Sequence, residues 1–123
     1  MSDNKLLIGK VAAITGVSRK AIRHYEAIGL LPTPDRIGNY RIYTQHHIVI
    51  ISMIKRAQAV GFKLAELLPL INLKLETGQF PLDFALQGIS DKRQFVQEEI
   101  TRLKAMDAEL IKLSSDLALL ASD

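Results

Sequence analysis

The first part of the chain alternates apolar and polar positions as two short helices joined by a turn would. Apolar residues recur at helical spacing and predict a first helix over about residues 9–14. Gly16 permits a tight turn, and Ser18 is a natural N-cap because its hydroxyl can accept a hydrogen bond from a free backbone N–H group. The second helix ends near Gly29. Its expected inward face consists of Ala21, Ile22, Tyr25 and Ile28.

A short hairpin is expected over residues 35–43, after two prolines that interrupt regular structure. Its turn is Gly38-Asn39, because both residues tolerate the positive φ that a tight hairpin turn needs. Strand alternation places Arg41 and Tyr43 on one face of the returning strand.

Two more helices follow. Thr44 is the expected cap of a helix over residues 46–60, which is apolar on nearly every side and is therefore expected to be buried on more than one face. A fourth helix runs from Lys63 to about Leu75. Pro69 lies inside it and is expected to bend or split it, because proline lacks the N–H donor and clashes with the preceding turn.

The last third of the chain predicts one long helix after a break. Ser90 and Asp91 are its candidate caps, and roughly 30 helical residues would span about 45 Å. Six apolar residues step by three and four in alternation, as the seam of a coiled coil does: Leu103, Met106, Leu110, Leu113, Leu117 and Leu120. A domain this small cannot cover so long a stripe, so we expect a second copy of the chain to cover it.

Composition excludes several classes of protein. The 123 residues suffice for one domain or one domain with an extension, and 48% are hydrophobic, which is ample for a core. Without cysteine the chain has no disulfide, thiolate metal site or thiol redox sensor. No apolar run approaches the length of a membrane span, so we expect a cytoplasmic protein. The motifs of catalysis are also missing, and we predict a protein that is no enzyme and has no metal site or cofactor.

Charge divides the chain into a basic and an acidic part. Residues 1–78 hold 11 Lys and Arg against 5 Asp and Glu, a net charge of +6. Residues 79–123 hold 5 against 8, a net charge of −3. A basic front part suits a polyanionic partner.

A helix-turn-helix followed at once by a basic wing is suited to double-stranded DNA. The second helix fits the major groove, and the wing reaches the flanking backbone. The candidate contacts on the helix are Ser18, Arg19, Lys20, Arg23 and His24, and those on the wing are Arg36, Tyr40, Arg41 and Tyr43. Arg19 and Lys20 suit base edges or phosphates, whereas Arg23 suits phosphates. Tyr25 is expected to pack its ring in the core.

Other residues leave alternatives open. Lys55, Arg56 and Lys63 suit either a continued phosphate track or an ordinary solvated surface. His46 and His47 are adjacent on a helix and point about 100° apart, which disfavours joint binding of one metal ion. Three apolar residues near the break are expected to pack on the core, with an effector pocket as the alternative: Phe80, Leu82 and Phe84.

The ordered set of motifs resembles the MerR family of bacterial transcription regulators. The resemblance covers Ile8 to about Leu68 and rests on Ile8-Gly-Lys-Val-Ala12, Thr15-Gly-Val17, Ala21-Ile-Arg-His-Tyr-Glu26, Ile28-Gly-Leu-Leu-Pro32, Tyr40-Arg-Ile-Tyr43 and Gly61-Phe62. Three positions depart from the usual family pattern. His24 stands where Tyr is frequent, Ala21 where Thr is common, and Asn39 where Gly usually precedes the wing Tyr.

The resemblance implies a fold dominated by α-helices: a winged helix-turn-helix with a small two-stranded wing, plus a long C-terminal dimerisation helix that forms an antiparallel coiled coil. We expect a DNA-binding domain over residues 1–75, a connector over 76–89 and the dimerisation helix over 90–121. The implied function is a homodimeric regulator that binds a pseudo-palindromic operator in a promoter spacer and distorts the DNA for RNA polymerase. An architectural or excision-type DNA-bending protein and a coiled-coil protein–protein adaptor are the alternatives, and the sequence does not identify an effector.

Overall fold

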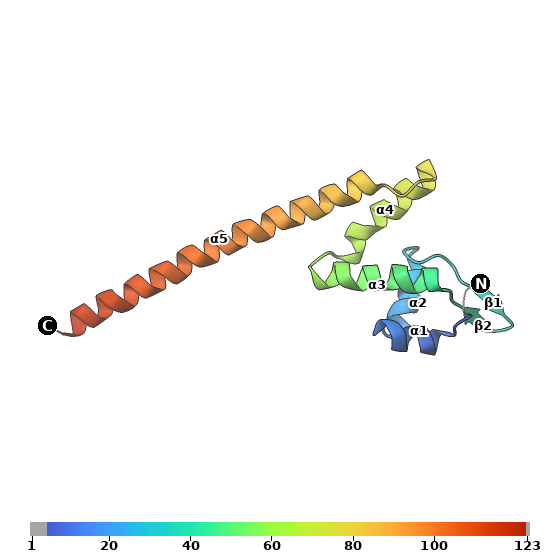
Figure 1. Cartoon of the computed structure of the whole chain (residues 1–123), viewed down its shortest axis with the longest axis horizontal. Helices are drawn as coiled ribbons and strands as arrows, with labels where there is room; N and C mark the ends of the chain where they lie inside the picture. Colours follow the sequence, from blue (N-terminus) through green and yellow to red (C-terminus); the bar gives the residue numbers. More distant parts are fainter. Residues whose placement is uncertain (1–4, 123) are drawn as a thin grey trace. The chain divides into compact units, whose positions relative to one another are not determined.

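The computed structural model describes residues 5–122, which fall into two units, one ending at Phe80 and one beginning at Pro81 (Figure 1). The first unit holds four helices and one hairpin. The second unit is a single helix. In chain order the elements are α1 (Ile8–Thr15), α2 (Arg19–Ala27), β1 (Asp35–Ile37), β2 (Tyr40–Ile42), α3 (Gln45–Ala59), α4 (Leu64–Thr77) and α5 (Leu82–Ala121).

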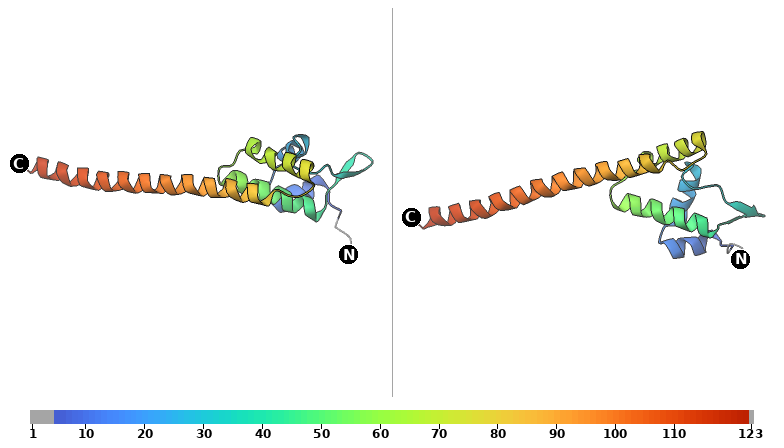
Figure 2. Two further views of the ribbon diagram at one scale, coloured as in Figure 1. Left: turned by 90° about the horizontal axis from the view of Figure 1, so that it is seen from above. Right: turned by 45° about the horizontal axis from the view of Figure 1, so that its top comes forward.

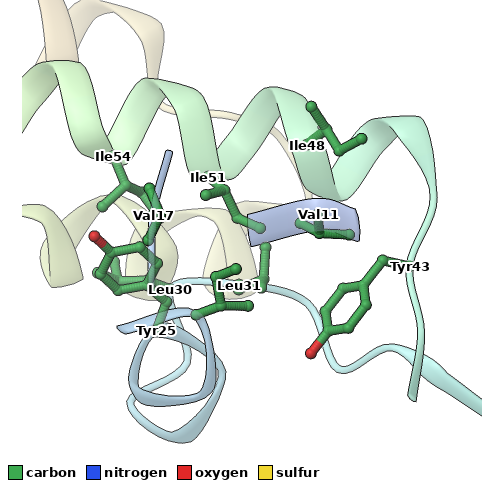
Figure 3. Packing of buried hydrophobic residues seen from close by; sticks show 10 residues of the cluster. Val11, Val17, Tyr25, Leu30, Leu31, Tyr43, Ile48, Ile51 and Ile54 are labelled. Carbon is green, nitrogen blue, oxygen red and sulfur yellow. The ribbon is translucent and has the colours of Figure 1, made fainter. Parts of the chain in front are cut away.

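The core of the first unit lies where α1, α2 and α3 meet (Figure 3). Its least exposed large side chains are Val11, Ile22, Leu31, Tyr43 and Ile51. One face of α4 packs against this core through partly buried apolar side chains: Leu64, Leu67, Leu68 and Ile71. Burying a side chain of this size contributes about 1.5–3 kcal/mol. The packing of Ile22, which belongs to α2, therefore helps to fix the position of α2 in the first unit.

The turn between α1 and α2 has the expected local chemistry. Gly16 ends α1 with φ of 71°, in the left-handed region that glycine tolerates best. The Ser18 hydroxyl accepts a hydrogen bond from the Ala21 N–H at 3.0 Å, which confirms Ser18 as the N-cap. The Thr15 hydroxyl donates to the Val11 carbonyl at 2.8 Å and accepts from the backbone N–H of the residue after Gly16 at 3.2 Å. The entry to α2 is therefore fixed from both sides.

The hairpin is antiparallel and projects from the helices in both views of Figure 2. Its register pairs Arg36 with Arg41 and Ile37 with Tyr40. Gly38 has φ of 61°, whereas no residue other than glycine among those described has a positive φ. The expectation that Asn39 shares the left-handed conformation is therefore wrong, and the turn depends on Gly38.

Two expectations for α3 and α4 need correction. The helix α3 is not buried on several faces: it buries Ile48, Ile51 and Ile54, while Val49 and Met53 lie about half exposed or more. The helix α4 runs through Pro69 without interruption, so the proline does not split it. Pro69 is the sixth residue of α4, so the helix lacks the backbone hydrogen bond that an N–H group at this position would donate.

The helix α5 begins earlier than the sequence indicated, and Figure 2 shows it as one continuous rod. It has 40 residues from Leu82, which at a rise of 1.5 Å per residue is about 60 Å. Ser90 and Asp91 lie inside the helix and cap nothing, because Pro81 precedes its first turn instead. All six seam residues from Leu103 to Leu120 are about half exposed or more.

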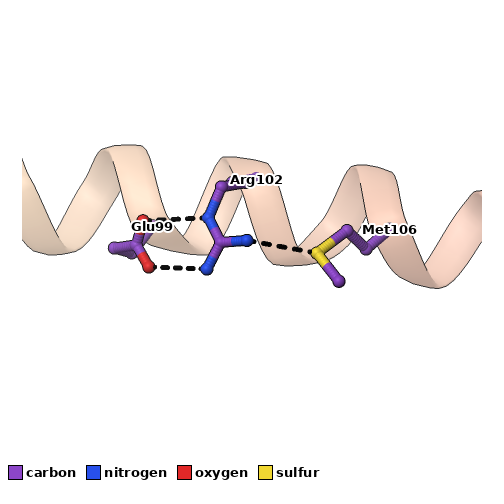
Figure 4. Close-up of polar contacts among 3 residues, drawn as sticks. All are labelled: Glu99, Arg102 and Met106. Atoms are coloured by element: carbon purple, nitrogen blue, oxygen red, sulfur yellow. Dashed lines mark hydrogen bonds and ion pairs between the residues drawn. The ribbon is translucent and has the colours of Figure 1, made fainter.

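Phe80 is more than half exposed at the end of the first unit, so the packing expected for it on the core of that unit is wrong. Leu82 and Phe84, on the second unit, are also more than half exposed. Farther along α5, a bidentate ion pair joins Arg102 to Glu99 with N–O distances of 3.0 and 2.8 Å, and Arg102 also contacts the Met106 sulfur at 3.3 Å (Figure 4). None of the helices between residues 5 and 122 combines the length and apolar character that a membrane span requires.

Candidate nucleic-acid interface

The helix α2 separates an apolar face from a cationic one. Ile22 and Tyr25 point into the core, and the Tyr25 hydroxyl donates to Gln58 Oε1 at 2.8 Å. Burial raises the pKa of Tyr25 above its usual range, so the ring is a neutral core residue as expected. The outward face is exposed and consists of Ser18, Arg19, Lys20, Arg23 and His24.

Arg19 lies against the backbone of α1. A Cβ atom placed on Gly9 would be 2.8 Å from Arg19 Nη2, which is closer than such contacts normally come. The Arg19 guanidinium therefore lies beside Gly9 of α1, and this exposed side chain is free to move from there.

The wing carries two arginines directly opposite each other. Arg36 and Arg41 are cross-strand partners and so share one face. Like charges in this arrangement destabilise a hairpin unless an anion lies near them. Arg41 Nε donates to Glu26 Oε1 at 2.9 Å, and the side chains of Arg41 and Glu26 are only 29% and 13% exposed. Glu26 belongs to α2, so this ion pair joins the wing to the helix.

The other face of the wing carries two large exposed side chains near the turn. Ile37 and Tyr40 form a cross-strand pair there, and both are more than half exposed. Tyr40 thus offers its ring and hydroxyl at the tip of the wing.

Tyr43 does not belong with the exposed wing residues. After β2 its backbone leaves the hairpin and pairs with Leu6, through N–O distances of 2.8 and 3.0 Å. Its ring is 0% exposed, and its hydroxyl has no hydrogen-bond partner among residues 5–122. Burial, followed by the nearby charge of Glu26, raises the pKa of Tyr43. The expectation of a DNA contact from Tyr43 is corrected, because a ring closed in by the core presents no surface to a duplex.

A buried histidine, His47, forms hydrogen bonds with one residue before the wing and one residue after it. His47 Nδ1 accepts from the Thr44 N–H at 3.1 Å, so the neutral ring carries its hydrogen on Nε2, which donates to the Pro32 carbonyl at 3.1 Å. Burial lowers the pKa of His47 below its usual range. The neighbouring His46 is exposed, so the two rings do not converge on one point.

Lys55 stabilises the turn that precedes α2. Its Nζ donates to the Thr15 carbonyl at 3.1 Å, at the C-terminal end of α1, where a cation also interacts favourably with the helix dipole. A Cβ on Gly16 would lie 2.6 Å from the same Nζ. Arg56 and Lys63 are exposed.

Comparison with known proteins agrees with this geometry. The family described as "MerR HTH family regulatory protein" matches residues 6–72, which is more than half of the chain, and the family described as "MerR, DNA binding" matches residues 48–113. The chain belongs to the MerR family. It is a DNA-binding transcriptional regulator, and the resemblance seen in its motifs is confirmed.

Individual MerR-family proteins are similar over most of this chain. The HTH-type transcriptional regulator CueR of Escherichia coli is 36% identical over 109 residues, which is 88% of this chain and 80% of CueR. The crystal structure of PbrR691 from Ralstonia metallidurans in complex with lead(II) is 28% identical, with a TM-score of 0.64, and covers 88% of this chain and 84% of its own. HiNmlR, a MerR family regulator lacking the sensor domain and bound to promoter DNA, shares the fold at 22% identity, with a TM-score of 0.66 over 82% of this chain and 76% of its own.

Proposed function

We propose that this MerR-family regulator binds a pseudo-palindromic promoter operator as a homodimer, with α2 in the major groove and the wing on the adjacent backbone. The observation that carries the proposal is the ion pair between Glu26 and Arg41, which brings the cationic wing next to the cationic helix. Ser18, Arg19 and Lys20 stand at the N-terminal end of α2, where a recognition helix meets base edges. The phosphate contacts are assigned to Arg23, His24, Arg36, Tyr40 and Arg41.

The homodimer is attributed to α5. Six seam residues at heptad spacing are half exposed or more in the single chain. Covering the rest of each side chain contributes on the order of 1 kcal/mol, and a symmetric partner doubles the number of side chains covered. The antiparallel coiled coil of the family is the arrangement we propose for this seam.

The regulatory step we propose is distortion of the promoter. Bending a site of this size costs about 1–6 kcal/mol, which must come from the phosphate and base contacts of both protomers. RNA polymerase, in the cytoplasm, is the partner that reads the distorted spacer. The protein is a regulator without catalytic activity of its own.

These 123 residues supply no thiolate ligand for a metal effector. PbrR691 was crystallised with lead(II), but this chain has no cysteine and so supplies no thiolate ligand for a soft metal ion. We therefore propose that any signal comes from a ligand or partner that needs no cysteine.

Selection of bound sequences from random duplex DNA tests the proposal. Two inverted half-sites are expected, centred one helical turn or a multiple of it apart, because the dimer is symmetric. Binding should weaken with salt by a log–log slope of about −0.9 for each phosphate contacted. No enriched sequence, or a monomer in sedimentation, would refute it. Transcription in vitro from a promoter with a long spacer distinguishes a regulator from an architectural DNA-bending protein. A monomer that shows no salt-dependent DNA binding would instead indicate a protein–protein adaptor.

A further inference from the structure

A carboxylate of α2 lies next to the cationic surface assigned to DNA. Glu26 follows Arg23 by three positions on α2, and Arg36 and Arg41 share the facing side of the wing. An acid in this place repels phosphates, so it opposes DNA binding through its charge alone. Its presence there suggests another contribution to binding.

We propose that Glu26 is a positioning residue for DNA binding: it orients the Arg41 guanidinium and holds the wing against α2. The inference rests on the proposed function of this surface. Glu26 Oε1 accepts from Arg41 Nε at 2.9 Å. Within residues 5–122 neither terminal nitrogen of Arg41 has a hydrogen-bond partner, so both are available to a phosphate oxygen.

The burial of the pair supports this role. Glu26 is 13% exposed and Arg41 is 29% exposed, so the carboxylate is the more buried partner and the arginine side chain keeps more of its surface open to solvent. Glu26 also offsets the repulsion between Arg41 and its cross-strand partner Arg36. The wing is thereby held in its binding geometry before DNA arrives, which reduces the ordering that binding would otherwise require.

If Glu26 acted on DNA binding only through its charge, its removal should tighten binding. If Glu26 positions Arg41, its removal should weaken binding. Glu26→Ala should weaken binding to the selected duplex about tenfold, because an oriented hydrogen bond to a phosphate is lost. The log–log salt slope should become shallower by about 0.9, the loss of one phosphate contact. Glu26→Gln should restore most of the affinity, because its amide oxygen still accepts from Arg41 Nε. Arg41→Lys keeps the charge without the fork and should resemble Glu26→Ala.

Asp35→Asn is the matched control. Asp35 is an exposed carboxylate of the same wing, and its removal should tighten binding slightly to selected and scrambled duplexes alike. The double variant Glu26→Ala with Arg41→Ala should bind no more weakly than Arg41→Ala alone, since Glu26 supports binding only through Arg41. Unfolding curves of each variant establish that the fold is retained, and Arg41→Lys and Glu26→Gln keep the test decisive if Glu26→Ala does not fold.

Two results separate the possible failures. If Glu26→Ala and Glu26→Gln both bind as tightly as the natural chain or more tightly, as Asp35→Asn does, the positioning role is overturned while DNA binding stands. If the natural chain binds no duplex at low salt, the proposed function falls, and the inference falls with it.

Discussion

Removing the Tyr43 hydroxyl should stabilise the protein. The ring is 0% exposed and packs edge-on against His47, with ring centroids 5.4 Å apart. Its hydroxyl has no partner among the described residues, and a buried polar group left without a hydrogen bond costs about 1–3 kcal/mol. Tyr43→Phe keeps the ring and its contact with His47 while removing that group. We expect the free energy of unfolding to rise by about 1 kcal/mol.

Tyr25→Phe is the matched control within the same core. Tyr25 is also buried, but its hydroxyl donates to Gln58 Oε1 at 2.8 Å. Losing this bond should lower the free energy of unfolding by about 1 kcal/mol. The two variants remove the same atom and should differ by about 2 kcal/mol, which is roughly a 30-fold difference in the unfolding equilibrium.

Urea unfolding at one fixed protein concentration measures both effects, because the stability of a dimer depends on concentration. If Tyr43→Phe lost as much stability as Tyr25→Phe, the Tyr43 hydroxyl would have a partner, such as an ordered water, and the reasoning would be refuted. DNA affinity provides a second check. It should not change in Tyr43→Phe, and a loss would restore Tyr43 to the DNA contacts.

Four further outcomes are expected. Arg23→Ala should weaken binding to every duplex and reduce the salt slope by about 0.9, measured by fluorescence anisotropy; equal affinity throughout would remove Arg23 from the interface. Leu110→Lys should dissociate the dimer in sedimentation, because it introduces a charge into the seam on each protomer; an intact dimer would mean that the interface lies elsewhere. The pKa of His47 is lowered by burial, so the unfolded chain takes up a proton at higher pH than the folded chain. Stability should therefore be complete above about pH 6.5 and decline as the pH falls toward the lowered value, with a smaller decline in His47→Gln; parallel unfolding curves for the two would contradict this. Lys55→Ala should lower the free energy of unfolding by about 1 kcal/mol through loss of the bond to Thr15, and an unchanged midpoint would show that water replaces Lys55 at no cost.

Local chemistry explains what could be predicted from the sequence. The cap at Ser18 and the turns at Gly16 and Gly38 each depend on the conformational freedom or hydrogen bonding of one residue, and the structure has all three. The apolar face of α2, with Ile22 and Tyr25 buried, follows from helical spacing alone.

What the sequence did not reveal depends on contacts between distant residues. Tyr43 continues the alternation of the wing, yet its pairing with Leu6 carries it into the core. The roles of Glu26 and Lys55 arise from partners 15 and 40 positions away. A lone acid within a basic helix was the one available signal for Glu26.

The start of α5 was misjudged for a different reason. Ser90 is a good N-cap by residue type, but an N-cap is needed only where a helix begins. The helix α5 begins at Leu82 and runs through Ser90. The N-terminal proline at position 81 was the better indicator, because its fixed φ suits the entry to a helix.

The open leucine stripe of α5 has a consequence for the newly made protein. A chain that has not met another copy exposes an apolar strip along most of a 40-residue helix. Such a surface attracts chaperones, proteases and unrelated hydrophobic chains. Because pairing is a second-order process, its rate falls with the square of abundance, so scarce copies remain vulnerable longest. Synthesis of several chains from one messenger in quick succession would shorten that exposure.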